Sequence, residues 1–282
     1  MKYIIYDPFT ENHKFLINNL IYNLNIFNEK LKEIIEVNDD EDNESIYIIF
    51  INHMFLIEND KAKKDYHNLL KKKNKILYIT EPLDLIIEKK FYVKIINELR
   101  PLKVYTYCEE NLTKIKPLCK YINFYPINKT YFKFLEINGP MYKNKDLTKI
   151  VFIGKMNDYR NKIKQLFKDD LIIIEDKYKK EEWIEIIKKY QYFINVHRRP
   201  NSKCFESMRI LPLLYNDCTI ISEHVNNKEE SYFKEGNIYF CKLEEIKDKF
   251  EEIKSISFSE ILRNSRNTEY NKFINMNIFF GN

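Results

Sequence analysis

Glycine and alanine are nearly missing from this chain of 282 residues, which holds four glycines and, in Ala62, a single alanine. With so few glycines, it contains neither the G-x-G-x-x-G fingerprint of dinucleotide-binding proteins nor a P-loop. Lys, Asn, Ile, Tyr and Phe are abundant instead, which is typical of a very AT-rich genome. Because lysine is then partly a codon habit, runs of lysine carry little weight as functional signals.

An excess of one charge is also lacking. The 47 basic and 42 acidic residues are spread along the chain and leave a net charge of +5. A dedicated nucleic-acid binder is usually more basic and gathers its charge in one patch. The densest basic run, Lys71 to Lys73 followed by Lys75, precedes an apolar run and most simply ends a helix. We therefore expect no nucleic-acid partner.

The cysteines lack the number and spacing of a zinc site or a disulfide framework. There are five, widely spaced and without a C-x-x-C motif: Cys108, Cys119, Cys204, Cys218 and Cys241. Reduced, mostly buried thiols fit this pattern and are typical of the cytosol.

Long hydrophobic runs are lacking as well. The longest, at 46–57, is broken by Asn52 and His53, and the apolar start is too short for a signal peptide. The sequence therefore predicts a cytoplasmic chain without a transmembrane segment.

The elements that are present alternate. Hydrophobic residues make up 44% of the chain and aromatic residues 15%, as in globular proteins, and the length favours two domains. Short β-branched or aromatic runs are followed by longer amphipathic stretches, which predicts βαβ units and parallel sheets. The first half has strand-like runs at 2–6, 46–51, 75–80, 103–107 and 122–125, and helical stretches at about 12–36, 60–73, 86–99 and 109–117.

The second half repeats this unit after a turn-rich segment around Asn138-Gly139-Pro140. Its strand-like runs are 149–153, 171–174, 192–196, 219–222 and 238–240, and its helical stretches are 157–168, 179–190, 203–215 and 243–254. We predict an α/β protein with two Rossmann-like domains, at 1–140 and 141–257, and a cleft between the carboxyl ends of their sheets. A last helix at about 258–282 can pack back on the first domain.

The first candidate site residues follow the run 149–153. Gly154, at a strand-to-helix turn, lets backbone N–H groups approach a phosphate, and Lys155 and Arg160 can supply countercharge. A plain tight turn is the alternative, because one glycine is a weak signal.

A denser polar group follows the run 192–196. His197, Arg198 and Arg199 form a basic loop that leads into a helix with Glu206 and Arg209 in its first turns. We expect these side chains to face one cleft, at the carboxyl edge of the sheet. The alternative is a structural role: His197 is a loop histidine hydrogen-bonded within the protein, and Glu206 and Arg209 form an i, i+3 ion pair on an exposed helix face. The apolar neighbours in that helix favour a functional site, because they bury much of the helix.

The next strand-like run, 219–222, ends in Glu223, again a carboxylate where a parallel strand ends. No serine or cysteine triad is apparent, and the five histidines form no pair of metal ligands. We therefore expect a ligand-binding site around Gly154, His197, Glu206 and Glu223, without a metal.

These segments resemble the donor-binding domain of GT-B glycosyltransferases of the group-1-like kind, especially short members found in giant DNA viruses and bacterial glycan gene clusters. The resemblance covers about residues 149–255 and is carried by Gly154-Lys155 with Arg160, by 195–198, by 205–210 and by Ile220 to Glu223. It implies an enzyme that moves a sugar from a UDP- or GDP-sugar to a glycan or other acceptor, in the cytoplasm (of the host, if viral), with no bound cofactor.

Retaining members of that family carry a Glu-x7-Glu motif whose second glutamate opens a helix and holds the donor ribose. Glu206 matches that glutamate, whereas the first would fall at Arg198, so retention and inversion both stay open. The basic pair that neutralises the donor diphosphate matches Lys155 and Arg160, with Arg198 and Arg199 as further candidates.

The resemblance assigns the acceptor to the first domain, and the catalytic candidates are His197, Glu81 and Asp7. Glu81 follows the run 75–80 and Asp7 follows the run 2–6, while His13 is a weaker candidate for a general base. Each of these residues could instead hydrogen-bond to the backbone of its own loop or be a surface group. The alternative function is a non-catalytic carbohydrate- or nucleotide-binding protein on a GT-B scaffold, because the first glutamate is missing and the donor loops hold few glycines.

Overall fold

The structure is a computed structural model, and it describes residues 3–6, 31–34, 45–50, 60–79, 83, 86–106, 108–117, 122–124, 145–175, 180–214, 216–233 and 237–256. The chain divides into two compact units, Met1–Pro126 and Ile127–Asn282. The predicted boundary at 140/141 and the predicted helix at 258–282 lie outside the described residues and stay predictions. In the described parts, no helix is both long and apolar enough to cross a membrane.

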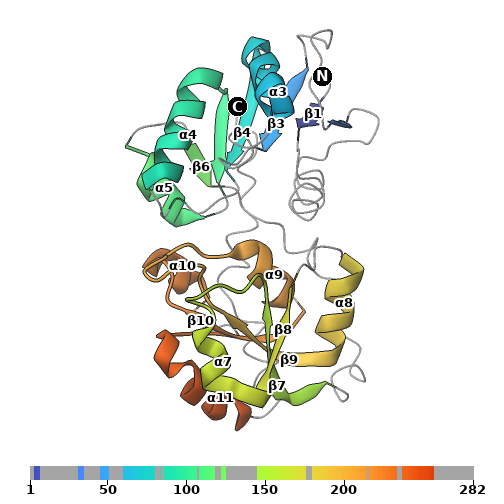
Figure 1. The fold of residues 1–282 in the computed structure, drawn as a ribbon, viewed down its shortest axis with the longest axis vertical. Helices are drawn as coiled ribbons and strands as arrows, with labels where there is room; N and C mark the ends of the chain where they lie inside the picture. Colours follow the sequence, from blue (N-terminus) through green and yellow to red (C-terminus); the bar gives the residue numbers. More distant parts are fainter. Residues whose placement is uncertain are drawn as a thin grey trace. The chain divides into compact units, whose positions relative to one another are not determined.

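The first unit contains a parallel sheet of six strands in the order β2-β1-β3-β4-β5-β6 (Figure 1). The strands are β1 (Tyr3–Tyr6), β2 (Leu31–Ile34), β3 (Ile46–Phe50), β4 (Asn74–Ile79), β5 (Lys103–Thr106) and β6 (Ile122–Phe124). The described helices are α3 (Asp60–Lys71), α4 (Ile86–Leu99) and α5 (Glu109–Ile115). All five strand-like runs predicted in the first half are therefore confirmed as strands, and the three helices agree with the predicted stretches.

Strand β2 corrects the prediction of a helix over 12–36. Residues Leu31 to Ile34 pair in parallel with Tyr3 to Tyr6 at the edge of the sheet. The segment reads Leu-Lys-Glu-Ile, and lysine and glutamate are poor strand formers, so no local signal marks a strand. Hydrogen bonding to β1 overrides the local preference, because β-propensity depends on the neighbours that a strand finds.

A buried polar network closes the carboxyl edge of the first sheet. The Asn111 side chain donates to Thr106 Oγ1 at 2.9 Å, and its Oδ1 accepts from the Leu83 backbone N–H at 2.9 Å. Both polar side chains are fully buried. The amide thus ties the segment after β4 to helix α5. Glu81, Asp7 and His13 lie outside the described residues.

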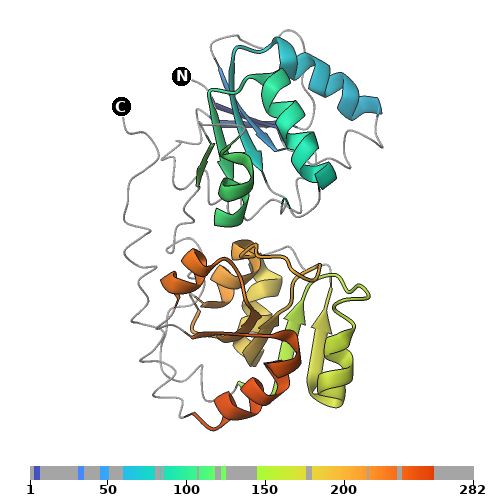
Figure 2. The same ribbon diagram turned by 90° about the vertical axis from the view of Figure 1, so that its left-hand side faces the viewer.

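The second unit contains a parallel sheet of five strands in the order β11-β10-β9-β7-β8. The strands are β7 (Asp146–Ile153), β8 (Leu171–Ile174), β9 (Tyr190–Asn195), β10 (Thr219–Glu223) and β11 (Ile238–Cys241). The helices are α7 (Lys162–Phe167), α8 (Lys180–Lys189), α9 (Ser207–Leu214), α10 (Asn227–Tyr232) and α11 (Ile246–Lys254), with short 3-10 turns at Lys168–Asp170 and Leu243–Glu245. The predicted α/β architecture with parallel sheets is confirmed; Figure 2 gives the same ribbon turned by 90°.

Three helices of this unit differ from the sequence prediction. Helix α9 begins at Ser207 rather than 203, and α7 begins at Lys162 rather than 157. Before α7 the residues form a turn in which the Asn157 side chain accepts from the Arg160 N–H at 2.9 Å, and before α9 residues 203–206 are irregular. Periodicity does not register either segment. Helix α10 was not predicted; it is one and a half turns long, and the Asn226 side chain caps it by accepting from the Lys228 N–H at 3.0 Å.

Apolar side chains from α7 and α11 pack together on the sheet. Phe167 of α7 and Tyr192 of β9 both meet the Phe250 ring of α11 edge-on, with centroids 5.7 and 5.4 Å apart. These residues belong to one buried cluster that also includes Phe152 and Ile194. The packing holds the end of α7 and the helix α11 against the sheet.

The strand order identifies where a ligand can bind. The first strand of the unit, β7, lies between β8 and β9, so the chain leaves it toward one side and later returns on the other. In parallel α/β sheets, the carboxyl ends at such a reversal point form a crevice. The loops after β7 and β9 carry Gly154 and His197, so the topology brings the two predicted groups together.

The predicted buried thiols are also present. Cys108, Cys204, Cys218 and Cys241 are buried and not in disulfides, whereas Cys119 lies outside the described residues. Burial raises the pKa of the Cys241 thiol to about 12, so its reactive thiolate is scarce at neutral pH.

Candidate functional site

Gly154 ends β7 in a conformation that favours glycine. Its φ is +143°, and its backbone N–H donates to the Ile174 carbonyl of β8 at 2.9 Å. A Cβ atom at this position would lie 3.0 Å from Arg209 Nη2 and 3.4 Å from Phe152 Cζ. The turn is therefore more than a plain tight turn, because it leaves room for an arginine of α9 against the backbone.

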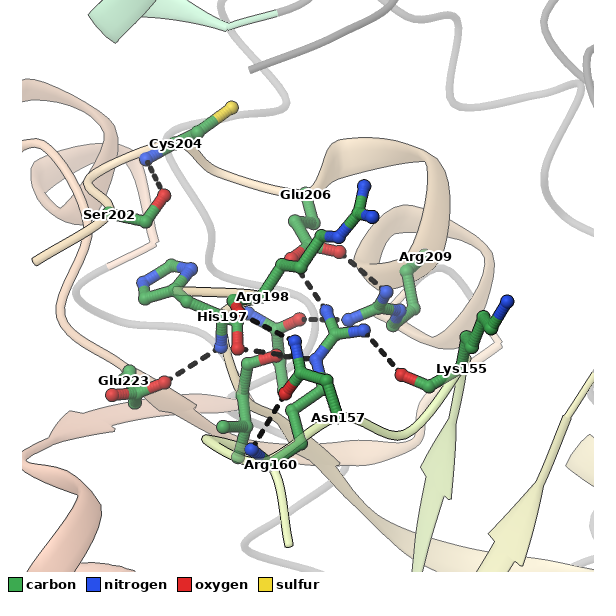
Figure 3. Close-up of polar contacts among 12 residues, drawn as sticks. Lys155, Asn157, Arg160, His197, Arg198, Ser202, Cys204, Glu206, Arg209 and Glu223 are labelled. Atoms are coloured by element: carbon green, nitrogen blue, oxygen red, sulfur yellow. Dashed lines mark hydrogen bonds and ion pairs between the residues drawn. The ribbon is translucent and has the colours of Figure 1, made fainter. Parts of the chain in front are cut away.

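Arg160 lies at the centre of the site, and its guanidinium group is turned into the protein (Figure 3). Nε donates to the carbonyls of Val196 at 3.0 Å and His197 at 3.2 Å, and Nη1 donates to the Lys155 carbonyl at 2.8 Å. Nη2 lies 3.3 Å from Glu206 Oε1. Since the residue is only 4% exposed, Arg160 connects the loops after β7 and β9 from within.

Glu206 connects this arginine to a second one. Its Oε2 lies 2.6 Å from Arg209 Nη2, and Arg209 Nη1 donates to Asn195 Oδ1 at 3.1 Å. The i, i+3 ion pair considered from the sequence is therefore present, but not on an exposed helix face: the two side chains are 18% and 17% exposed. We call Arg160, Glu206 and Arg209 the arginine cluster.

Glu206 also lies immediately before helix α9. Its backbone carbonyl accepts from the N–H groups of Arg209 at 2.9 Å and Ile210 at 3.0 Å, so it occupies the position just before the first helical residue. A carboxylate at a helix N-terminus is stabilised by the helix dipole. The backbone therefore holds the Glu206 carboxylate at the helix start.

Three residues that support the cluster were not singled out as site residues from the sequence. The Phe152 ring lies beneath both guanidinium groups, 5.1 Å from Arg160 and 5.4 Å from Arg209. Asn157 accepts from the Arg160 N–H at 2.9 Å and donates to the Arg198 carbonyl at 2.7 Å, while Asn195 donates to Ser222 Oγ at 2.9 Å. For Asn195, the available signal was a polar residue at the end of a buried strand. The fold alone determines the partners of all three residues.

The arginine cluster contains more positive than negative charge. Burial lowers the pKa of the Arg160 guanidinium to about 10, while the neighbouring Glu206 carboxylate acts in the opposite direction and Arg209 and Arg198 add to the lowering. At neutral pH Arg160 therefore stays protonated. Two guanidinium groups meet one carboxylate, which leaves one net positive charge at the crevice.

Lys155 and Arg198 are exposed beside this cluster. Among the residues that the structure describes, neither side chain forms a hydrogen bond or an ion pair, and Figure 3 shows the Lys155 ammonium pointing away from Arg160. Arg199 is half-buried and has a partner of its own. Of the predicted phosphate-binding cations, Lys155 and Arg198 are therefore the ones with open donors.

Glu223 uses both carboxylate oxygens within the protein. Oε2 accepts from the His197 backbone N–H at 2.7 Å, and Oε1 accepts from the Tyr159 hydroxyl. Burial, with the neighbouring Glu223 charge, raises the pKa of Tyr159 well above its usual value, so the phenol stays a donor. The Glu223 carboxylate thus connects the His197 loop to the segment before α7. The role of Glu223 in donor binding stays a prediction.

Replacing Tyr159 with phenylalanine is expected to lower the free energy of unfolding of the second unit by about 1.5 to 3 kcal/mol, because a buried carboxylate loses a donor. Trp183, the single tryptophan of the chain, lies buried in α8, so its fluorescence during urea unfolding reports on this unit. Tyr190→Phe is the control, since its hydroxyl has no hydrogen-bond partner among the described residues. Equal losses in the two variants would contradict the role of Glu223.

The His197 ring lies on the other side of its loop from Lys155 and Arg209 (Figure 3). Its Nε2 is 3.0 Å from the His224 carbonyl. The structure therefore brings the backbone of His197 to the arginine cluster, through the carbonyl that Arg160 binds, but not its imidazole.

Comparisons with known proteins agree with this architecture. No family model matches the chain, and no curated protein matches its sequence. Among solved structures, WaaG, a glycosyltransferase of lipopolysaccharide biosynthesis, is similar with a TM-score of 0.58 at 7% identity, over 98% of this chain and 95% of that one. Anabaena HepE, solved with UDP and glucose, is similar with a TM-score of 0.55 at 7% identity, over 97% of both chains.

The DNA-modifying enzyme β-glucosyltransferase, whose substrate is uridine diphosphoglucose, is similar with a TM-score of 0.55 at 12% identity, over 97% of this chain and 95% of that one. At such low identities the likeness concerns the fold. The two parallel α/β units and these similarities together show that the chain has the GT-B fold of the glycosyltransferases.

Proposed function

We propose that this chain is a glycosyltransferase that binds a nucleoside diphosphate sugar at the arginine cluster of its second unit and transfers the sugar to a glycan or other acceptor. The observation that carries the proposal is a net positive cluster at the reversal point of a parallel sheet, with two exposed cations beside it. Two structural neighbours described as glycosyltransferases, WaaG and β-glucosyltransferase, support it. HepE and β-glucosyltransferase are described with UDP or a UDP-sugar.

The diphosphate would be bound by the open cations. Lys155 and Arg198 have no anionic partner among the described residues, and Arg209 is partly exposed next to them. Positive groups that are already in place stabilise the charge that develops on the leaving diphosphate, because they need little reorganisation during the reaction. Arg160 supports this site indirectly, since its donors hold backbone carbonyls and Glu206 rather than facing solvent.

The ribose would be bound by Glu206. Each carboxylate oxygen already accepts from one arginine, but a carboxylate has about four acceptor positions, so hydroxyl groups of a ribose can still donate to it. The arginines prevent the carboxylate from rotating, which reduces the entropy that binding would otherwise lose.

A comparison of UDP with 2′-deoxy-UDP tests this assignment. Calorimetric titration should give a dissociation constant about tenfold lower for UDP, as expected when a hydroxyl bonds to a charged group. Glu206→Gln keeps the shape of the side chain and should remove most of that preference. Glu185→Gln, at an exposed ion pair on α8, is the matched control and should keep it. GDP and dTDP titrated in parallel identify the base.

No binding of UDP, GDP or dTDP to the unaltered protein would contradict the donor site. An unchanged preference for UDP over 2′-deoxy-UDP in Glu206→Gln would contradict the ribose role alone.

A non-catalytic nucleotide- or carbohydrate-binding protein on the same scaffold is the second candidate. It is favoured by the hydrogen bonds that Arg160 and Glu223 form within the protein. These bonds leave fewer charged groups to contact a reacting ligand. Release of UDP from UDP-glucose above background, dependent on Lys155, supports the enzyme; tight UDP binding without any release supports the binding protein. In the enzyme, the acceptor and the general base, with Glu81 and Asp7 as candidates, belong to the first unit.

A further inference from the structure

A pocket lies within the second unit, on the His197 side of the loop that follows β9. It has a volume of about 610 Å³, within the range of small-molecule sites. Its walls come from α7, from the loop between β9 and α9, and from the segments after β10 and β11. Neither Lys155 nor any member of the arginine cluster lines it.

The inner wall of this pocket contains an acceptor without a donor. His197 is 2% exposed, and its Nε2 lies 3.0 Å from the His224 carbonyl, which can only accept. Nε2 therefore carries a hydrogen, and in the neutral form of the ring Nδ1 presents a lone pair. Among the described residues Nδ1 has no hydrogen-bond partner. A buried acceptor left in this state is unfavourable, so the site suits a ligand that brings a hydroxyl group.

The mouth of the pocket is basic. Lys162, Lys203 and Lys242 line it and are exposed, and we call them the rim lysines. Among the described residues none of them pairs with a carboxylate; Lys162 lies over the Tyr159 ring at 5.0 Å. Several other lysines of the unit are paired, as Lys247 is with Asp170 and Glu251.

The carboxylates of the pocket do not cancel this charge. Glu223 is held by Tyr159 and the His197 N–H, and Glu244 is a single carboxylate against three ammonium groups. Lysine binds phosphate as a compact point charge and needs no fixed geometry. Three of them lining one pocket favour an anionic ligand.

We propose that this pocket binds a phosphorylated polyol, such as a sugar phosphate, with its phosphate at the rim lysines and a hydroxyl group donating to His197 Nδ1. The site is separate from the nucleotide site and does not depend on the proposed function. Leu166 and Leu243 on its walls give the apolar face of a sugar ring a contact surface.

Calorimetric titration with glucose 6-phosphate, glucose and inorganic phosphate tests the proposal. Glucose 6-phosphate carries both sugar hydroxyls and a phosphate, whereas each of the other probes carries only one of these groups. Glucose 6-phosphate should bind at least about tenfold more tightly than either of the others. Lys203→Ala and Lys162→Ala should each weaken it about threefold to tenfold, as for a charge-assisted contact. Lys164→Ala, at an exposed position of the same helix α7 outside the pocket, is the matched control and should have no effect.

Three results would overturn the proposal: glucose 6-phosphate binding no better than phosphate, Lys162→Ala and Lys203→Ala behaving like the Lys164→Ala control, or saturating UDP displacing the sugar phosphate. The last would make the pocket part of the nucleotide site. Lys155→Ala separates the two proposals, since it should weaken UDP and leave glucose 6-phosphate unchanged.

Discussion

Replacing Arg160 with alanine is expected to destabilise the second unit by about 3 to 5 kcal/mol, the loss typical of breaking a buried ion pair from one side. The change leaves three backbone carbonyls, those of Val196, His197 and Lys155, without their donor. It also leaves Glu206 with one guanidinium partner instead of two. A surface cation would give a far smaller change, so the size of the loss distinguishes the internal role of Arg160 from direct phosphate binding.

Urea unfolding followed by Trp183 fluorescence measures this loss for the second unit alone, because Trp183 is the single tryptophan of the chain and is buried in α8. Lys155→Ala is the control on the same loop: its side chain is exposed, so stability should change by less than about 0.5 kcal/mol. Arg160→Lys should recover little of the loss, since one ammonium group cannot reach carbonyls on two loops and a carboxylate together. A loss below about 1 kcal/mol in Arg160→Ala would refute the central role of this residue.

Replacing Gly154 with alanine is expected to have the second largest effect. Its φ of +143° strains any residue with a Cβ atom, at about 1 to 3 kcal/mol. The new methyl group would also lie 3.0 Å from Arg209 Nη2, so the guanidinium must shift and the contact with Glu206 must loosen. We expect UDP affinity to fall about tenfold together with the stability.

A double-mutant cycle with Arg209→Ala separates the two causes. In the Arg209→Ala background the close contact is gone, so Gly154→Ala should then cost only its backbone strain. Trp183 fluorescence in urea measures all four proteins on the same scale. An equal loss in both backgrounds would show that the arginine does not press against the turn, and that the glycine is required for the backbone alone.

The described strands of both units follow from the sequence, apart from β2. Runs such as Ile76 to Ile79 and Phe193 to Ile194 are buried on the sheet, and a parallel strand covered on both faces must be apolar along its length. That requirement is local, so it can be seen in the sequence. Strand β2 lacks this apolar run, because its Lys32 and Glu33 are poor strand formers. Only pairing with β1 makes the segment a strand.

The sequence predicted where the candidate site residues lie in the fold but not which residues they contact. Gly154, His197, Glu206 and Glu223 all lie where parallel strands end or the following helix begins, and this edge is where the loops of the unit meet. Their partners, however, come from segments up to 64 residues away, as between Tyr159 and Glu223. No spacing rule reaches that far along a chain.

What the sequence determined by itself is therefore the alternation of strands and helices, the parallel sheets and the edge at which polar residues gather, because each depends on patterns within about twenty residues. The tertiary structure alone decided which cations point inward and which stay open. Arg160 and Lys155 are five residues apart and both are cationic, yet Arg160 is 4% exposed and holds two loops together while Lys155 reaches solvent. That difference arises because a buried guanidinium needs several acceptors at once, and only the folded loops after β7 and β9 supply them.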